Sequence, residues 1–263
     1  MLALFVNFKD NSAAVKIKIK TKTKMENSDN LLSNENKGRC IKELSDLKPL
    51  RKPKDPKSYA AVLVPLIQLD DGQSGLLFTK RSSTLRRNPR EVCYPGGKVD
   101  DQESFIEAAK RETFEEIGIS KDSIDIWGAM PALSDHTGTL IQKMFKIIYV
   151  CTPHIVLIGT RAVIPIVGYL QEFHPSKLKP NKAEVQDVFV KPVLDLHRPH
   201  VAGYTQFRVP NSPGYSLPIY NCQPYPIWGM TAIITFQFLS VFLRGRKGFR
   251  HKLNYQSPIL TKN

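Results

Sequence analysis

Cysteine is scarce in this chain. Four cysteines stand far apart in 263 residues, and no two of them form a C-x-x-C pair. Their scarcity argues against a zinc ribbon and against the disulfide framework of a small secreted protein, so the sequence predicts a reducing compartment. Glycine, with 15 residues, and proline, with 19, are near their average frequencies. This composition excludes collagen-like, coiled-coil and wholly disordered chains.

The chain also lacks a clear membrane-spanning run, which needs about 18 apolar residues without a charge. The run at 147–160 is shorter and is interrupted by a proline and a histidine. The run at 227–243 is borderline, but polar threonines and a serine lie between its apolar positions. Those apolar positions recur at helical spacing: Met230, Ile233, Ile234, Phe238, Val241 and Phe242. We predict a buried amphipathic helix here, and the alternative is a membrane-anchored protein that uses this helix.

Acidic residues are fewer than basic ones, 24 against 38, which gives a net charge of +14. The excess lies at the ends, because residues 1–57 hold 14 Lys and Arg against 7 Asp and Glu, and residues 244–263 hold 6 against none. The body between them, 58–243, is nearly neutral, with 18 against 17. Nucleic-acid binding needs a basic face on the folded part, so the sequence predicts no nucleic-acid partner.

Composition divides the chain into segments. We predict a disordered basic leader, a helical or extended lead-in, a folded domain, C-terminal strands with the amphipathic helix that complete this domain, and a tail. These segments cover 1–38, 39–57, 58–197, 198–253 and 254–263. A mitochondrial signal is the alternative for the leader, although it has lysine in place of arginine and contains Asp10; Met25 is an alternative start.

A β-hairpin is predicted at the start of the body. The apolar run Tyr59–Ile67 indicates a buried strand, Asp70-Asp71-Gly72 a turn, and Leu76–Thr79 a second strand. Arginines follow, and then the pair Gly96-Gly97 after a proline. Two glycines permit a tight turn and leave room for a ligand to approach the main chain.

A helix that concentrates carboxylates is predicted next. Asp101 is the expected cap at its start, and Gly118 ends it in a left-handed conformation. The expected buried stripe consists of Ile106, Ala109, Thr113 and Ile117, and the adjacent arc carries Glu112, Glu115 and Glu116. Like charges one turn apart repel. Hard divalent cations such as Mg²⁺ or Mn²⁺ prefer such oxygen ligands, and the alternative is a solvated acidic face.

The spacing of Gly97, Glu103, Arg111, Glu112, Glu115, Glu116 and Gly118 matches the pattern G-x5-E-x7-R-E-U-x-E-E-x-G-U, where U is apolar. Only Thr113 departs from it. The chain therefore resembles the Nudix hydrolases, which cleave a diphosphate attached to another group. The resemblance implies an α/β fold in which a mixed β-sheet is sandwiched between helices. It also implies that Glu112 and Glu116 bind the metal, that Glu115 is a further ligand or the base, and that Arg111 orients the glutamates. Glu103 would steady the loop or help to hold the metal.

The residues upstream narrow the resemblance to the coenzyme A diphosphatases within this family, and to their peroxisomal type 7 members. Their signature, L-L-T-x-R-S-x3-R-x3-G-x3-F-P-G-G, is similar to Leu77-Phe78-Thr79-Lys80-Arg81-Ser82, then Arg86, then Cys93-Tyr94-Pro95-Gly96-Gly97. Arg90 stands where the signature has glycine, and Tyr94 replaces phenylalanine. The likeness extends over 59–250. It implies substrate binding by Arg81, Arg86, Gly96 and Gly97, because guanidinium groups bind phosphate in a bidentate way.

The resemblance implies hydrolysis of coenzyme A and acyl-CoA esters to 3′,5′-ADP and 4′-(acyl)phosphopantetheine. The general base is then Glu115, or Glu184 from a later loop. Two alternatives stay open: a Nudix enzyme for another diphosphate, such as ADP-ribose or a dinucleotide, and a degenerate Nudix binding module. The sequence does not indicate whether the protein is a monomer or an oligomer.

Two further expectations concern the insertion and the compartment. Residues 143–161 exceed what the resemblance predicts, and they indicate either a lid or a translated intron. The resemblance implies a peroxisome, although the chain ends in Leu260-Thr261-Lys262-Asn263 and not in a Ser-Lys-Leu type of address. The mitochondrion and the cytoplasm are the alternatives.

Overall fold

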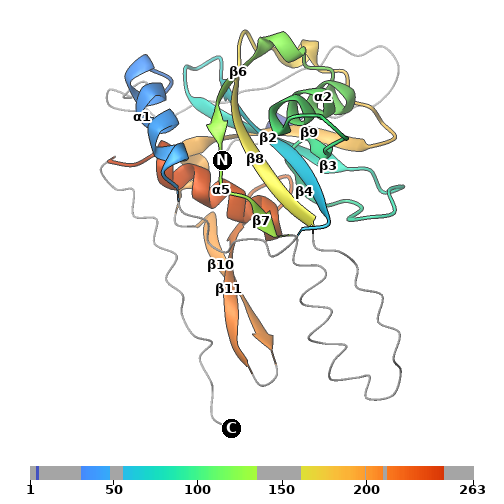
Figure 1. The fold of residues 1–263 in the computed structure, drawn as a ribbon. Coiled ribbons are helices and arrows are strands. Elements are labelled where there is room, and N and C mark those ends of the chain that lie inside the picture. Colours follow the sequence, from blue (N-terminus) through green and yellow to red (C-terminus); the bar gives the residue numbers. More distant parts are fainter. Residues whose placement is uncertain are drawn as a thin grey trace.

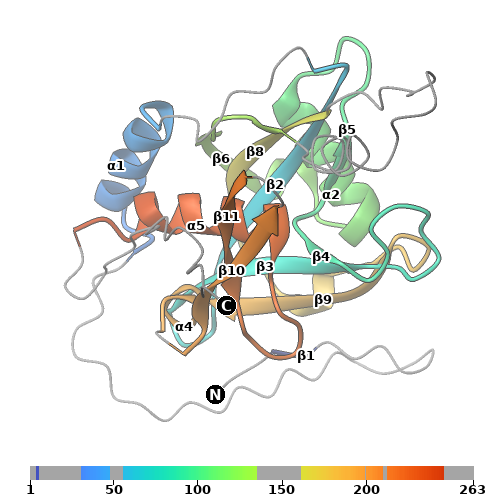
Figure 2. The same ribbon diagram turned by 90° about the horizontal axis from the view of Figure 1, so that it is seen from below.

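The computed structural model of the chain describes residues 4–5, 31–47, 56–134, 161–198, 200–209 and 212–245. There a mixed β-sheet lies between helices on its two faces (Figures 1 and 2). Along the sheet the order is β1 (Leu4–Phe5), β9 (Val185–Pro192), β3 (Ser74–Arg81), β2 (Ser58–Gln68), β8 (Arg161–Leu170) and β6 (Ile124–Ala129). Short strands pair with three of these: β4 (Val92–Cys93) with β3, β5 (Gly96–Lys98) with β2, and β7 (Leu133–Ser134) with β8. The predicted fold class is confirmed.

Strands β2 and β3 form the predicted hairpin. They pair in antiparallel fashion, with Leu66 opposite Leu76, and the turn at Gly72 has φ 80°. On its other edge β2 pairs with β8 in parallel, from Ser58 opposite Arg161 to Leu66 opposite Tyr169. Most of β2 is buried because helices cover both faces of the sheet, as in other sheets with parallel pairs.

A hydrophobic core lies on each face of the sheet. On one face, Ala108, Ala109 and Ile117 of α2 (Phe105–Ile117) share a core with Leu63 and Ile67 of β2. On the other face, α1 (Asn34–Ser45) and α5 (Gly229–Phe242) cover the sheet, with α4 (Val193–Leu196) beside β9 (Figure 2). The strands are therefore held between two layers, and α2 is alone among these helices in covering its face.

Helix α1 belongs to the folded body. Ser33 caps its start, and Cys40 and Leu44 are buried in the same core as α5. Arg39 donates hydrogen bonds to the last carbonyls of α5, at Val241 (2.9 Å) and Phe242 (3.1 Å). The helix begins inside the range 1–38 that we expected to be a disordered leader, so residues 34–38 do not belong to such a leader. The pairing of its buried face with α5 was not visible in a segment of such polar composition.

Helix α5 is buried over most of its circumference. The predicted helix is present, but Thr231 and Thr235, expected on a polar face, are only 8% and 0% exposed. Thr231 Oγ1 donates to the carbonyl of Val92 (2.9 Å), and Thr235 Oγ1 shares a 2.8 Å hydrogen bond with the hydroxyl of Tyr94. Because these partners satisfy both hydroxyls, the helix does not need the solvated face that we expected. None of the helices in the described ranges is long and apolar enough to cross a bilayer.

The remaining elements are short or peripheral. Strands β10 (Ala202–Val209) and β11 (Ser212–Tyr220) form a second antiparallel sheet, and this hairpin projects away from the main sheet (Figure 1). Single 3₁₀ turns occur at Lys121–Ser123 and Pro175–Lys177. Strand β8 begins at Arg161, and the other residues of the predicted insertion, 143–160, lie outside the described ranges.

Candidate active site

Helix α2 carries the glutamates, and its ends are set by local hydrogen bonds. Ser104, not Asp101, is the N-cap: its hydroxyl accepts from the backbone N–H of Glu107 (3.2 Å), and the Glu107 carboxylate accepts from the backbone N–H of Ser104 (2.9 Å). This capping box satisfies two donors at once, so it prevails over a single carboxylate three residues earlier. Gly118 ends the helix with φ 77°, as predicted.

The buried face of α2 differs from the predicted stripe at its first turn. Ala109, Thr113 and Ile117 are buried, but Ile106 is 40% exposed. Ala108 takes its place in the core, and Thr113 satisfies its hydroxyl on the carbonyl of Ala109 (2.7 Å). The stripe is displaced toward the carboxylates, which brings Glu116 inside the protein with 4% of its surface exposed.

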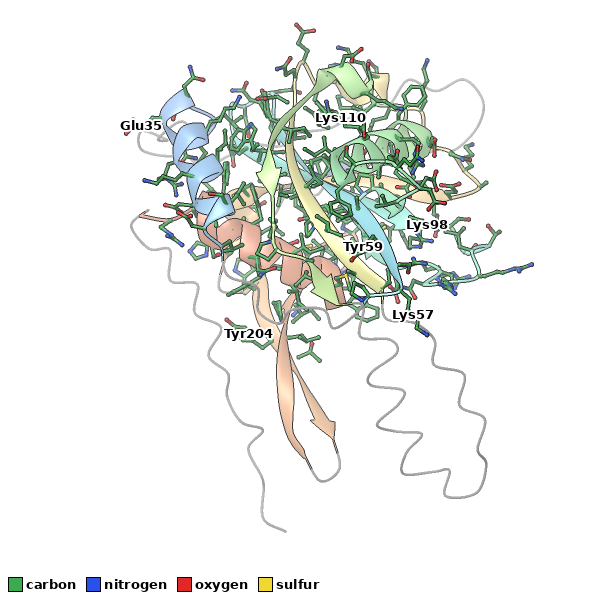
Figure 3. All side chains as sticks on the ribbon, in the orientation of Figure 1. Glu35, Lys57, Tyr59, Lys98, Lys110 and Tyr204 are labelled. Carbon is green, nitrogen blue, oxygen red and sulfur yellow. The ribbon has the colours of Figure 1, made fainter. Side chains whose placement is uncertain are left out.

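Arg111 joins the loop before α2 to the carboxylates on it. It donates two hydrogen bonds of 2.9 Å to Glu103, one of 3.0 Å to Glu112 and one of 3.1 Å to Glu115. A further hydrogen bond of 3.1 Å reaches the carbonyl of Lys98 at the end of β5. Figure 3 shows Lys98 near α2. Arg111 holds the pKa of Glu103 below its ordinary value. One guanidinium therefore fixes the positions of three carboxylates.

Glu116 is the most strongly perturbed carboxyl group of the site. Burial, together with the charges of Glu112 and Glu184, raises its pKa from 4.5 to about 8, against the lowering effect of Arg81 and of the backbone N–H of Gly96. Its Oε2 atom is buried and has no hydrogen-bond partner. Burial also raises the pKa of Glu112, against the opposing effect of Arg111. Glu116 is thus a buried carboxyl group with one oxygen left for a ligand.

The glycine pair leaves the space that the carboxylates occupy. A Cβ at Gly96 would collide with the carbonyl oxygen of Ala61 and lie 2.5 Å from the Cα of Val62, and Gly96 has φ 154°. A Cβ at Gly97 would lie within the carboxylate of Glu112. Gly96 therefore lets β5 pair with β2, and Gly97 lets α2 approach β5.

Arg81, at the end of β3, lies beside Glu116. Its charge lowers the pKa of Glu116, and its Nε atom is buried and has no hydrogen-bond partner. Sequence reasoning missed its neighbours. Cys93 contacts Arg81, and its sulfur lies 3.2 Å from the hydroxyl of Thr79; burial raises the pKa of this thiol to about 11. Thr79 and Cys93 are opposite each other in the pairing of β3 with β4, a register that no local motif reveals.

The other residues predicted to belong to the site are more exposed than Glu116 or lie in loops. Arg86 is exposed in the loop 82–91 and makes no contact with the glutamates among the interactions of the described residues. Arg90, which replaces the glycine of the signature, has φ 63°, so the backbone keeps a conformation that glycine favours. Glu115 has a side chain that is 50% exposed. Glu184 is partly buried, and its carbonyl accepts from the backbone N–H of Ser82 (2.8 Å).

The donor set fits a hard divalent cation. Glu112 and Glu116 offer carboxylate oxygens, the ligand type that Mg²⁺ and Mn²⁺ prefer, and the unpartnered Oε2 of Glu116 needs a donor or a cation. Across the described ranges, no three His, Cys, Asp or Glu side chains form a group that could hold a metal ion as they stand. Glu112 and Glu116 are one turn apart on α2, and Arg111 binds both Glu112 and Glu115.

Comparison with known proteins gives matches over most of the chain. Residues 57–192 match the NUDIX domain. Nudix hydrolase 3 of Caenorhabditis elegans is 31% identical over 226 residues, which cover 78% of this chain and 84% of that protein. The human mitochondrial coenzyme A diphosphatase NUDT8 is 34% identical over 178 residues, which cover 67% of this chain and 66% of that protein. Among solved structures, a MutT/nudix family protein from Enterococcus faecalis aligns with a TM-score of 0.43 and 16% identity, over 80% of this chain and 73% of that one.

Proposed function

Because this chain belongs to the Nudix hydrolase family, we propose that it hydrolyses the diphosphate bond of coenzyme A and of acyl-CoA esters. The products are 3′,5′-ADP and 4′-(acyl)phosphopantetheine. The name of the human relative, a coenzyme A diphosphatase, supports this choice of substrate, as does the match of Arg81 and Gly96-Gly97 to the signature of that subfamily. The reaction is a hydrolysis: the water oxygen forms a bond to one phosphorus of the diphosphate, the bond from that phosphorus to the bridging oxygen breaks, and the other half of the substrate leaves as a phosphate monoester.

One observation carries the proposal: the buried Glu116 and Arg81 each keep an atom without a hydrogen-bond partner among the described residues. The charge of Arg81 acts on Glu116, which also accepts from the backbone N–H of Gly96. A carboxylate oxygen and a guanidinium N–H left free at one place suit a cation and a phosphate oxygen that bind together. The glycines supply the room for such a ligand to approach the main chain. A merely structural ion pair would satisfy both atoms.

We assign each residue of the site a separate role in the reaction. Glu112 and Glu116 would hold Mg²⁺ or Mn²⁺, which when bound offsets the charge of the diphosphate and makes the attacking water more acidic. Arg81 binds an oxygen of the diphosphate and orients it. Arg111 and Glu103 hold Glu112 in position. Glu115 or Glu184 accepts the proton of the attacking water.

The test is release of 3′,5′-ADP from coenzyme A by purified protein with added Mg²⁺ or Mn²⁺. We expect release by the wild type and loss of at least about 10²-fold in kcat for Glu116→Gln, because the charge that holds the cation is removed. Glu172→Gln is the matched control, since this exposed glutamate lies in the turn after β8. Release of AMP from ADP-ribose but not of 3′,5′-ADP from coenzyme A would refute the substrate. Turnover of no diphosphate by folded protein would favour a binding module.

Separate variants test the base. Removing the base lowers kcat and removes the rise of activity with pH, whereas removing a residue that only positions another leaves that rise in place. We therefore compare the pH profiles of Glu115→Gln and Glu184→Gln with that of the wild type. An unchanged profile in both variants would refute both assignments.

We propose the mitochondrion as the compartment, ahead of the peroxisome that the subfamily resemblance implies. The human relative is named mitochondrial, and this is the support for the choice. The measurement is the distribution of the full chain between purified mitochondria and peroxisomes. Recovery with peroxisomes would restore the earlier prediction.

A further inference from the structure

A cleft of about 490 Å³ opens beside the end of α2, outside the group of glutamates. Two lysines, Lys179 and Lys182, line it together with the polar side chains of Ser82 and Gln186. Leu178 and Val185, which are almost fully buried, supply apolar walls. The lining is therefore positively charged, and next to it lies a site that is rich in carboxylates.

Hydrogen bonds hold the cleft at a fixed place relative to Glu116. The backbone N–H of Lys179 donates to the carbonyl of Ile117 (2.8 Å), and that of Asn181 donates to the carbonyl of Glu116 (2.9 Å). On the other side, the backbone N–H of Ser82 donates to the carbonyl of Glu184 (2.8 Å). The lysine segment is thus attached to the last turn of the helix that carries the glutamates.

Within the described ranges, the lysines of the cleft form no ion pair with a carboxylate. Among the ion pairs of the described residues, neither Lys179 nor Lys182 has a partner, whereas the nearby Lys177 lies 4.0 Å from Glu172. Arg81, which precedes Ser82 in the chain, does not line the cleft, and its charge lowers the pKa of Glu116. Two ammonium groups beside a hydroxyl and an amide are donors that suit a phosphate with two negative charges.

We propose that this cleft binds a phosphate monoester on the nucleotide half of the substrate, which in coenzyme A is the 3′-phosphate. The inference rests on the proposed function, because it assumes that the diphosphate lies between Glu116 and Arg81. Arg81 and Ser82 are consecutive, so the cleft begins one residue, about 3.8 Å of backbone, from the arginine that is assigned to the diphosphate. Lys179 and Lys182 are then specificity-determining residues that distinguish coenzyme A from diphosphates without this group.

The experiment compares coenzyme A with dephospho-coenzyme A, which differ only in the 3′-phosphate. For the wild type we expect a kcat/KM roughly tenfold or more higher on coenzyme A, the size that hydrogen bonds to a charged group confer. The double variant Lys179→Gln/Lys182→Gln loses this preference and keeps its kcat/KM on dephospho-coenzyme A. Lys177→Gln is the matched control, because Lys177 is exposed on the same segment but does not line the cleft.

Binding of the product gives a readout that does not depend on turnover. By calorimetry without metal, the wild type should bind 3′,5′-ADP more tightly than 5′-AMP, and the double variant should bind both alike. Equal binding of the two nucleotides by the wild type would overturn the inference, and so would equal losses of the double variant on both substrates. If the wild type hydrolysed neither substrate, the proposed function would fail, and the nucleotide comparison would still decide whether the cleft binds the phosphate.

Discussion

Glu116 combines two features that oppose each other in the free protein. It is buried, which disfavours its charge, and it is placed where a cation needs that charge. The protein retains a carboxyl group whose pKa is raised to about 8. Such a perturbed group beside another carboxylate is typical of functional sites, because nothing in the packing of α2 requires a glutamate there.

The stability of the metal-free protein should depend on the protonation of Glu116. The folded state keeps the proton up to about pH 8, whereas the unfolded chain releases it near pH 4.5. Between these values the folded state binds more protons, so the free energy of unfolding falls as the pH rises, by up to a few kcal/mol. Glutamine has no charge to bury, so Glu116→Gln should lack this part of the fall. Urea unfolding of both proteins at pH 5 and pH 8 with a chelator measures it, and parallel curves would contradict the raised pKa.

The two glycines should respond differently to alanine. At Gly97 a methyl group meets the end of a side chain, so Gly97→Ala should fold, displace Glu112 and lower kcat/KM by about 10²-fold. At Gly96 the methyl group meets the backbone of β2 in a conformation that side chains disfavour, so Gly96→Ala should lose about 3 kcal/mol or more of stability. Activity assays and urea unfolding on the same samples separate the two effects. Full activity in a folded Gly97→Ala variant would show that Glu112 need not lie against β5.

At the scale of single residues, the sequence predicted side chains that belong to one local motif, but it did not predict contacts between strands or with distant loops. The spacing of Arg111 and the glutamates on one helix is visible in the sequence, and the structure places them around one another. Cys93 beside Arg81 depends on the register of β3 with β4, and Lys179 beside the end of α2 depends on a loop that returns after 60 residues. No periodicity encodes either contact, so the sequence analysis named Arg81 and the exposed Arg86 for phosphate and did not name the lysines.

At the scale of elements, α2 shows how competing caps are resolved. Asp101 and Ser104 are both good N-cap residues, but only Ser104 has a glutamate three positions later. Ser104→Ala should therefore lower the free energy of unfolding by about 1 kcal/mol, since it leaves a helix N–H without its partner. Asp101→Ala is the control, with an expected change within about 0.5 kcal/mol. Urea unfolding measures both, and the reverse order would place the start of the helix at Asp101.

In helix α5, the sequence pattern did not predict that the threonines would be buried. Its threonines were taken as a polar face because hydroxyls usually face water. Buried partners on β4 and on Tyr94 replace that water, and only the three-dimensional structure reveals them. The helix itself was predictable, because the helical spacing of its apolar residues does not depend on the partners of the threonines.

At the scale of the whole molecule, binding of a divalent cation should stabilise the fold. A ligand that binds only the folded state adds about 2.7 kcal/mol at a concentration 100 times its Kd, which raises Tm by roughly 5–10 °C for a domain of this size. We expect this shift for the wild type with Mg²⁺ or Mn²⁺ and a much smaller one for Glu116→Gln. Thermal unfolding with sodium at equal ionic strength is the control. Equal shifts in both proteins would exclude Glu116 as a ligand.

The fold class was predictable from the sequence because the Nudix motif specifies a helix, a glycine loop and the strands around them. The hairpin of β2 and β3 was predicted from a short apolar run, a turn and a second strand, all of which are local signals. The parallel pairing of β2 with β8 did not, since its partners are about 100 residues apart and the residues between them gave no signal of parallel order.

That pairing also affects the order in which the protein is made. A ribosome releases β2, the glycine pair and all of α2 before Leu170, the last residue of β8, has been synthesised. Until then the central strand has one open edge, and the layer beneath α2 is incomplete. Closing so long a loop is slow, and an exposed strand edge attracts other chains. We expect assembly of the catalytic centre to occur late in synthesis, at the stage when chaperones would be needed most.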